Sequence, residues 1–195
     1  MLRYCFLIFF LTLSAKVSAF EILALGTSDT NCKAGDQFYT KTLNNLLTEN
    51  KIDAEVINAG KDGDTPFFML NRLESSINEK TKIVIFEPGP NDRNKTANLK
   101  DTDKILKFLN EKNIKIIYVS NSIIENELEG FERAKKFNAY YYGNAARVIP
   151  KTRKYFAYDT LPGEYGHMTK EGCIFWAEMM YRLIETIISE KNSQN

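Results

Sequence analysis

The stretch EILALGTSDT, residues 21–30, joins an apolar run to a polar turn. An apolar run of this length that ends in glycine is typical of a buried β-strand followed by a loop. Similar runs end in loops three more times along the chain, at residues 54–57, 82–86 and 114–119. The sequence therefore predicts four buried strands.

Segments with the period of an α-helix separate and follow these strands. Apolar side chains recur in them at steps of three and four residues. The expected helices are 38–50, 67–79, a segment around 105–109, 131–142 and 170–191. Alternating strands and helices predict a parallel sheet with helices on both faces. In such sheets ligands bind beyond the carboxyl ends of the strands, so we expect a site in the loops there.

The composition is that of one soluble globular domain. The chain has 195 residues, of which 44% are hydrophobic and 26% charged. A mean hydropathy of -0.34 excludes a protein with several membrane spans. The formal net charge of +1 provides no basic surface for nucleic acid, so we expect no nucleic-acid partner.

Residues 1–19 differ from the rest of the chain. A basic start, an apolar stretch over residues 4–13 and the small residues 17–19 form the pattern of a signal peptide cut before Phe20. A stretch of about ten residues is too short to span a bilayer. We predict a signal peptide over 1–19 and a single domain over 20–195, in a secreted or periplasmic protein without a membrane span; an uncleaved anchor is the alternative. Loss of Arg3 and Lys16 would bring the formal charge to -1.

Two cysteines, Cys32 and Cys173, remain after the predicted cut. In an oxidising compartment they could form a disulfide. Two unpaired buried thiols are an equally good interpretation, because two cysteines alone carry little pattern.

Polar residues that could take part in catalysis follow the predicted strands. Ser28 follows the first strand, Gly63 the second and Asn91 the third, and Glu164 and His167 lie before the last helix. Taken singly, each has a simpler explanation as a helix cap or a turn residue.

Together these residues supply what acyl transfer requires. A serine hydroxyl is a weak nucleophile without a base, and His167, the single histidine of the chain, could be that base. The imidazole needs an acid that orients it, for which Glu164 is the nearest candidate. Donors for the oxyanion would be the Ser28 N–H, the Gly63 N–H and the Asn91 amide.

This ordered set resembles the SGNH, or GDSL-like, hydrolase superfamily. The resemblance implies an α/β fold of the flavodoxin-like kind, a three-layer α/β/α sandwich with about five parallel strands in the order 2-1-3-4-5. It implies Ser28 as nucleophile, His167 as base, and Gly63 and Asn91 as oxyanion donors. The implied substrates are carboxylic esters, namely acyl lipids, thioesters or O-acetyl sugars, and no cofactor or metal is implied.

The chain departs from the family pattern at four positions. Asp29 follows the nucleophile, where a carboxylate that points inward would oppose the oxyanion, although it could instead cap the next helix. The family's acid before the histidine is usually Asp, whereas this chain has Glu164, with Asp159 as the reserve candidate. Pro90 has no N–H to donate. No proline follows His167.

Other functions remain open at this point. The chain could be a secreted binding module that keeps the fold without catalysis. A phosphate-binding flavodoxin-like protein is less favoured, because no Gly-x-x-x-x-Gly-Lys-Ser/Thr motif occurs. Residues 67–69 and 140–142 could line an acyl groove or fill the core, and we favour the core.

Overall fold

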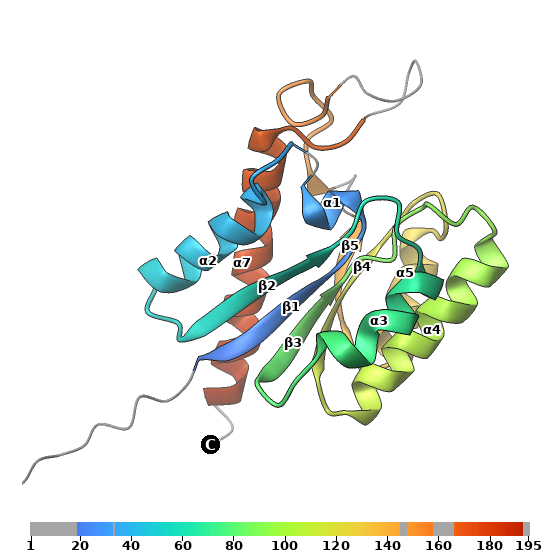
Figure 1. The fold of residues 1–195 in the computed structure, drawn as a ribbon, viewed down its shortest axis with the longest axis horizontal. Coiled ribbons are helices and arrows are strands. Elements are labelled where there is room, and N and C mark those ends of the chain that lie inside the picture. The colour runs from blue at the N-terminus through green and yellow to red at the C-terminus, as the bar shows by residue number, and fades with distance from the viewer. Residues whose placement is uncertain (1–18, 33, 145–147, 158–165, 193–195) are drawn as a thin grey trace, which may run out of the picture.

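A computed structural model of the protein describes residues 19–32, 34–144, 148–157 and 166–192. All but the last residue of the predicted signal peptide lies outside the described residues. Five parallel strands form one sheet in the order β2-β1-β3-β4-β5 (Figure 1). The strands are β1 (Phe20–Gly26), β2 (Ala54–Gly60), β3 (Thr81–Phe86), β4 (Lys115–Ser120) and β5 (Tyr140–Asn144).

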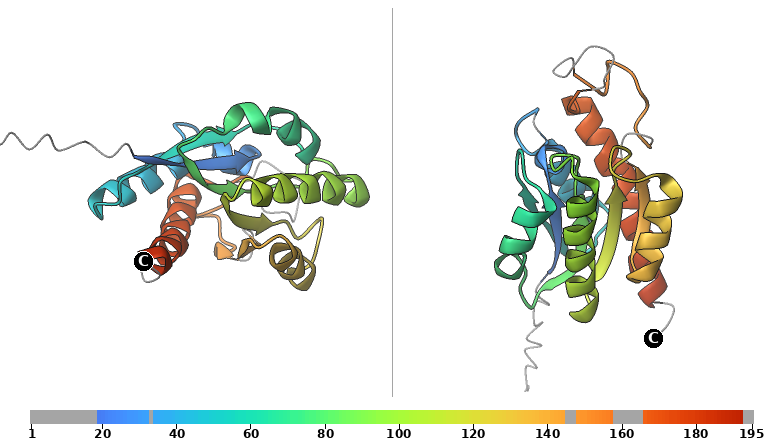
Figure 2. Two further views of the ribbon diagram at one scale, coloured as in Figure 1. Left: turned by 90° about the horizontal axis from the view of Figure 1, so that it is seen from below. Right: turned by 90° about the vertical axis from the view of Figure 1, so that its right-hand side faces the viewer.

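Helices cover both faces of this sheet, which makes three layers (Figure 2). One face is covered by α2 (Phe38–Glu49) and α7 (Lys170–Asn192). The other is covered by α3 (Pro66–Ser76), α4 (Lys95–Glu111) and α5 (Glu127–Lys136). A single helical turn, α1 (Ser28–Asn31), follows β1 directly. The predicted three-layer α/β fold and its strand order are confirmed.

The central strand β1 supplies both halves of the core. Ile22 and Ala24 point to the side of α2 and α7, while Leu23 and Leu25 point to the side of α3, α4 and α5. Alternate residues of a strand face opposite sides, so a strand buried on both faces must be apolar throughout. This explains the unbroken apolar run at the start of the domain.

The predicted helix over residues 131–142 is wrong at both ends. α5 begins earlier, where the Asn126 side chain and Glu129 form a reciprocal capping box. It ends before Asn138, whose φ of 54° lies in the left-handed region. Tyrosines then form β5, a strand that the local pattern did not indicate, where Tyr140 pairs with Ile117 of β4.

Within the described part of the chain, no helix has the length and apolar character needed to cross a membrane.

Candidate active site

Ser28 lies at the first position of α1, where the chain leaves the carboxyl end of β1 (Figure 1). Thr27 caps this turn, and its side chain accepts a hydrogen bond from the Asp29 N–H at 3.4 Å. Gly26 permits the tight packing, because a Cβ there would lie 2.0 Å from the Thr30 hydroxyl. The turn thus presents Ser28, which is half-buried, at the edge of the sheet where ligands bind in this fold class.

His167 approaches Ser28 from the far end of the chain. Its Nε2 atom lies 3.0 Å from the Ser28 Oγ atom, within hydrogen-bond distance. Backbone hydrogen bonds with Ala157 hold the segment, since the Ala157 N–H donates to the His167 carbonyl at 2.9 Å. An isolated bridge between Phe156 and Met168 adds to this. The histidine is therefore fixed by a small antiparallel contact just before α7 begins.

A disulfide ties the two segments together. Cys32, directly after α1, is bonded to Cys173 in the first turn of α7. Both residues are buried. The covalent link therefore joins the element that carries Ser28 to the helix that follows His167.

The loop with Gly63 contacts both α1 and the Asn91 loop. The Lys61 N–H donates to the Gly26 carbonyl at 3.0 Å, and the Asn31 amide donates to Asp62 at 2.9 Å. The Asn91 amide donates to the Asp64 carbonyl at 2.9 Å. An asparagine amide has two N–H groups, and this contact uses one. Gly63 itself has a φ of 72°, a conformation that favours glycine.

Asp64 fixes the loop that contains Gly63. Its carboxylate is buried and accepts two hydrogen bonds from the Arg72 guanidinium, the shorter at 2.7 Å. Arg72 also donates to the Ala59 carbonyl at 2.8 Å. The loop after β2 is thus held to α3 by an ion pair in which two guanidinium N–H groups donate to the Oδ2 atom of Asp64.

The candidate acids Glu164 and Asp159 both lie outside the described residues.

Asp29 does not cap the helix after Ser28, as the sequence suggested it could. Thr27 is the N-cap of α1, and Asp29 lies in the first turn. Threonine and aspartate both serve as caps, and in this chain the threonine occupies the N-cap position. Asp29 is half-buried and lines a cavity beside the Ser28 and His167 pair.

Glu87 is a site residue that the sequence analysis missed. It follows β3, is 3% exposed, and its Oε2 atom accepts hydrogen bonds from the Thr27 N–H, the Thr27 hydroxyl and the Thr30 hydroxyl at 2.9, 2.8 and 3.2 Å. Burial raises the pKa of the Glu87 carboxyl to about 8, and the neighbouring Asp29 adds to the rise. An acidic residue directly after a buried strand was the available signal.

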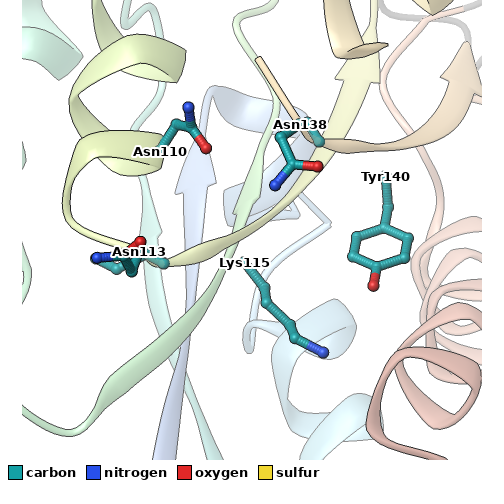
Figure 3. A pocket seen from close by; sticks show the side chains of 7 residues that line it. Asn110, Asn113, Lys115, Asn138 and Tyr140 are labelled. Atoms are coloured by element: carbon teal, nitrogen blue, oxygen red, sulfur yellow. The ribbon is translucent and has the colours of Figure 1, made fainter. Parts of the chain in front are cut away.

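Two cavities differ in their position on the sheet. One, of about 160 Å³, lies at the carboxyl ends of the strands and is lined by residues that flank Ser28, Asn91 and His167. Another, of about 350 Å³, is lined by Lys115 and Tyr140, which begin β4 and β5, together with Asn110, Asn113 and Asn138 (Figure 3). The second cavity therefore lies at the opposite edge and takes no part in the site.

The apolar residues after the Gly63 loop divide between surface and core. Phe67 and Phe68 are 51% and 56% exposed in the first turn of α3, whereas Met69 is buried. Tyr140–Asn144 forms strand β5, and its three tyrosines are half-buried. The expected core position holds for Met69, and Phe67 and Phe68 lie on the surface.

Solved structures that share this fold are esterases and lipolytic proteins of the SGNH or GDSL family. TesA superposes with a TM-score of 0.72 at 15% identity, covering 83% of this chain and 96% of TesA. The esterase EstA from Pseudoalteromonas sp. gives 0.71 at 20% identity, covering 87% and 98% of the two chains. AlinE4, an SGNH-hydrolase family esterase, gives 0.60 at 21%, covering 89% and 96%. No family model and no curated protein sequence matches the chain. The likeness shows the fold, a five-stranded α/β sheet arranged as in SGNH hydrolases.

Proposed function

We propose that the protein is a serine ester hydrolase that cleaves carboxylic esters through an acyl-enzyme at Ser28. The observation that carries the proposal is the 3.0 Å distance between the Ser28 Oγ atom and the His167 Nε2 atom. A nucleophile and a base within hydrogen-bond reach are the minimum requirement for acyl transfer by serine. The fold, which many esterases share, supports the same conclusion.

In the proposed reaction His167 takes the proton from Ser28 as its Oγ atom attacks the ester carbonyl. The negative charge that develops on the carbonyl oxygen would be stabilised by the Ser28 N–H, the Gly63 N–H and the Asn91 amide. His167 then gives the proton to the departing alcohol, and a water molecule releases the acid by the same steps in reverse order. We assign the orienting acid to Glu164, with Asp159 as the alternative.

We also propose that the protein acts outside the cytoplasm, as a secreted or periplasmic enzyme. The signal-peptide pattern over residues 1–19 supports this location. The disulfide between Cys32 and Cys173 supports it too, because such bonds persist in oxidising compartments.

Hydrolysis of p-nitrophenyl esters tests the proposal. The protein that begins at Phe20 should hydrolyse p-nitrophenyl acetate, and a series of longer acyl chains would define the substrate range. Ser28→Ala and His167→Ala should each lower kcat by about 10⁴-fold or more, because the two residues act as a unit. Ser75→Ala, which removes an exposed hydroxyl from α3, is the matched control. Full activity in Ser28→Ala or His167→Ala would rule the mechanism out.

A further inference from the structure

A buried asparagine of α4 holds the loop that contains Asn91. Asn98 is fully buried, and its side-chain amide donates to the Gly89 carbonyl at 3.2 Å and to the Asp92 carbonyl at 3.3 Å. An asparagine amide has two N–H groups, so one side chain can serve both carbonyl groups at once. Because Gly89 precedes Asn91 and Asp92 follows it, the two hydrogen bonds fix the chain on both sides of the proposed oxyanion donor.

The burial of Asn98 is favourable only because its amide has these partners. A buried amide without hydrogen bonds costs about 1 to 3 kcal/mol of folding free energy. The Oδ1 atom of Asn98 accepts a longer hydrogen bond from the Thr102 hydroxyl, at 3.4 Å, one turn further along α4. The orientation of the side chain is thus fixed, with its N–H groups directed at the loop.

The loop contacts both α4 and the turn that carries Ser28. The helix is itself fixed to the sheet by three buried side chains, Ile105, Leu106 and Leu109. A Cβ at Gly89 would lie 2.3 Å from the Thr27 Cγ2 atom, so the loop is packed tightly against the nucleophile turn. A shift of the loop away from α4 would therefore change the position of Asn91 relative to Ser28.

We propose that Asn98 is a positioning residue for ester hydrolysis, which holds the Asn91 amide where it can stabilise the oxyanion formed at Ser28. The inference rests on the proposed function and adds to it a residue that acts through Asn91. Asn98 is fully buried, so it does not contact the substrate itself.

The size of the expected effect follows from the geometry that an oxyanion donor requires. A displacement of about 1 Å in a catalytic group can lower the rate by roughly 10²-fold. Loss of an oxyanion donor lowers it by about 10² to 10³. Asn98→Leu removes both N–H donors and leaves the Asn91 amide in the protein but without its support. We expect this substitution to lower kcat by roughly 10- to 100-fold.

Steady-state kinetics with p-nitrophenyl acetate distinguishes positioning from a purely structural role. Asn98→Leu should lower kcat while KM changes by less than about twofold, because the oxyanion forms only in the reaction. Thr81→Val is the matched control, since it removes a buried hydroxyl that accepts a hydrogen bond from the Asn78 N–H at the opposite edge of the sheet. It should leave kcat unchanged. Thermal unfolding checks that each variant is folded, and Asn98→Ala carries the test if Asn98→Leu does not fold. An unchanged kcat in the folded Asn98 variant would overturn the proposal.

A double-mutant cycle shows whether Asn98 acts through Asn91. Asn98→Leu should lower kcat by roughly tenfold or more in the native protein. In the Asn91→Ala protein the same substitution should lower kcat by less than about twofold, because the amide that Asn98 positions is then absent. Equal factors in the two backgrounds would show that Asn98 acts independently of Asn91, which would also overturn the proposal.

Nuclear magnetic resonance of the protein without substrate tests the same contact independently of catalysis. The side-chain amide signals of Asn91 are identified by their absence from the spectrum of Asn91→Ala. These signals should shift in Asn98→Leu and stay unchanged in Thr81→Val. Shifted signals in a protein that hydrolyses no ester would refute the proposed function and leave the contact between Asn98 and the loop in place. Unshifted signals in an active esterase whose kcat is insensitive to Asn98→Leu would refute the positioning role alone.

Discussion

Glu87 holds the turn that carries Ser28 with a carboxyl group that is mostly protonated at neutral pH. Its Oε2 atom accepts hydrogen bonds from Thr27 and Thr30, and the pKa of the Glu87 carboxyl is raised to about 8. Since a raised pKa means that the folded protein keeps a proton which the unfolded chain has released, this residue links stability to pH.

The direction in which the free energy of unfolding changes with pH follows from the raised pKa of Glu87. The stabilising contribution of Glu87 is fully present below its unfolded pKa, near 4.5, and is lost as the pH rises through about 8. The free energy of unfolding of the native protein should therefore fall over this window, with a Glu87 contribution of up to about 1.4 kcal/mol per pH unit. Urea unfolding at several pH values measures it. Glu87→Gln should show a flatter profile, and an identical slope in both proteins would contradict the assignment.

The proposed role of the Asn91 amide can be tested by substitution. If its amide stabilises the oxyanion, Asn91→Ala should lower kcat by about 10² to 10³ with little change in KM. Asn110→Ala, an exposed asparagine at the opposite edge of the sheet, is the control. Steady-state kinetics with p-nitrophenyl acetate tests this role. An unchanged kcat in Asn91→Ala would show that the Asn91 amide does not stabilise the oxyanion.

Among the elements, the short turn α1 depends on close contact with the ends of β1 and β2. A Cβ at Gly60 would lie 2.3 Å from the backbone nitrogen of Asn31, which leaves no side-chain movement to relieve the clash. Gly60→Ala should therefore destabilise the protein by about 1 to 3 kcal/mol and displace Ser28. Urea unfolding and esterase activity should both show a loss. If Gly60→Ala has the stability and activity of the unsubstituted protein, the prediction is wrong, because α1 then shifts without loss of folding free energy.

The sequence predicted elements well wherever one local signal dominated. An apolar run that ends at Gly26 predicts both the strand and the turn with Ser28, because burial on two faces and a tight turn are local requirements. Strand β5 was missed because tyrosines suit a strand or a half-buried helix face equally, and pairing with β4 decides between them. Glu87 was missed because its hydrogen bonds to Thr27 join residues 60 positions apart.

The disulfide joins two segments of the molecule that are 141 residues apart in the sequence. A bond that closes so long a loop restricts the unfolded chain strongly, so its loss should cost about 2 to 5 kcal/mol. Unfolding in urea with and without dithiothreitol measures this cost. A double variant, Cys32→Ser with Cys173→Ser, should be destabilised to a similar degree and should not respond to the reductant. Equal unfolding midpoints for the native protein in both conditions would contradict the prediction.

The hydrogen bond between Ser28 and His167 spans 139 residues, which has a consequence for the order of events during synthesis. Ser28 leaves the ribosome long before His167. Until residues 166–169 return to the edge of the sheet, the serine has no base beside it, and its hydroxyl is a weak nucleophile. Under the proposed function, the growing polypeptide therefore cannot hydrolyse esters until residues 166–169 and α7 have packed against the sheet.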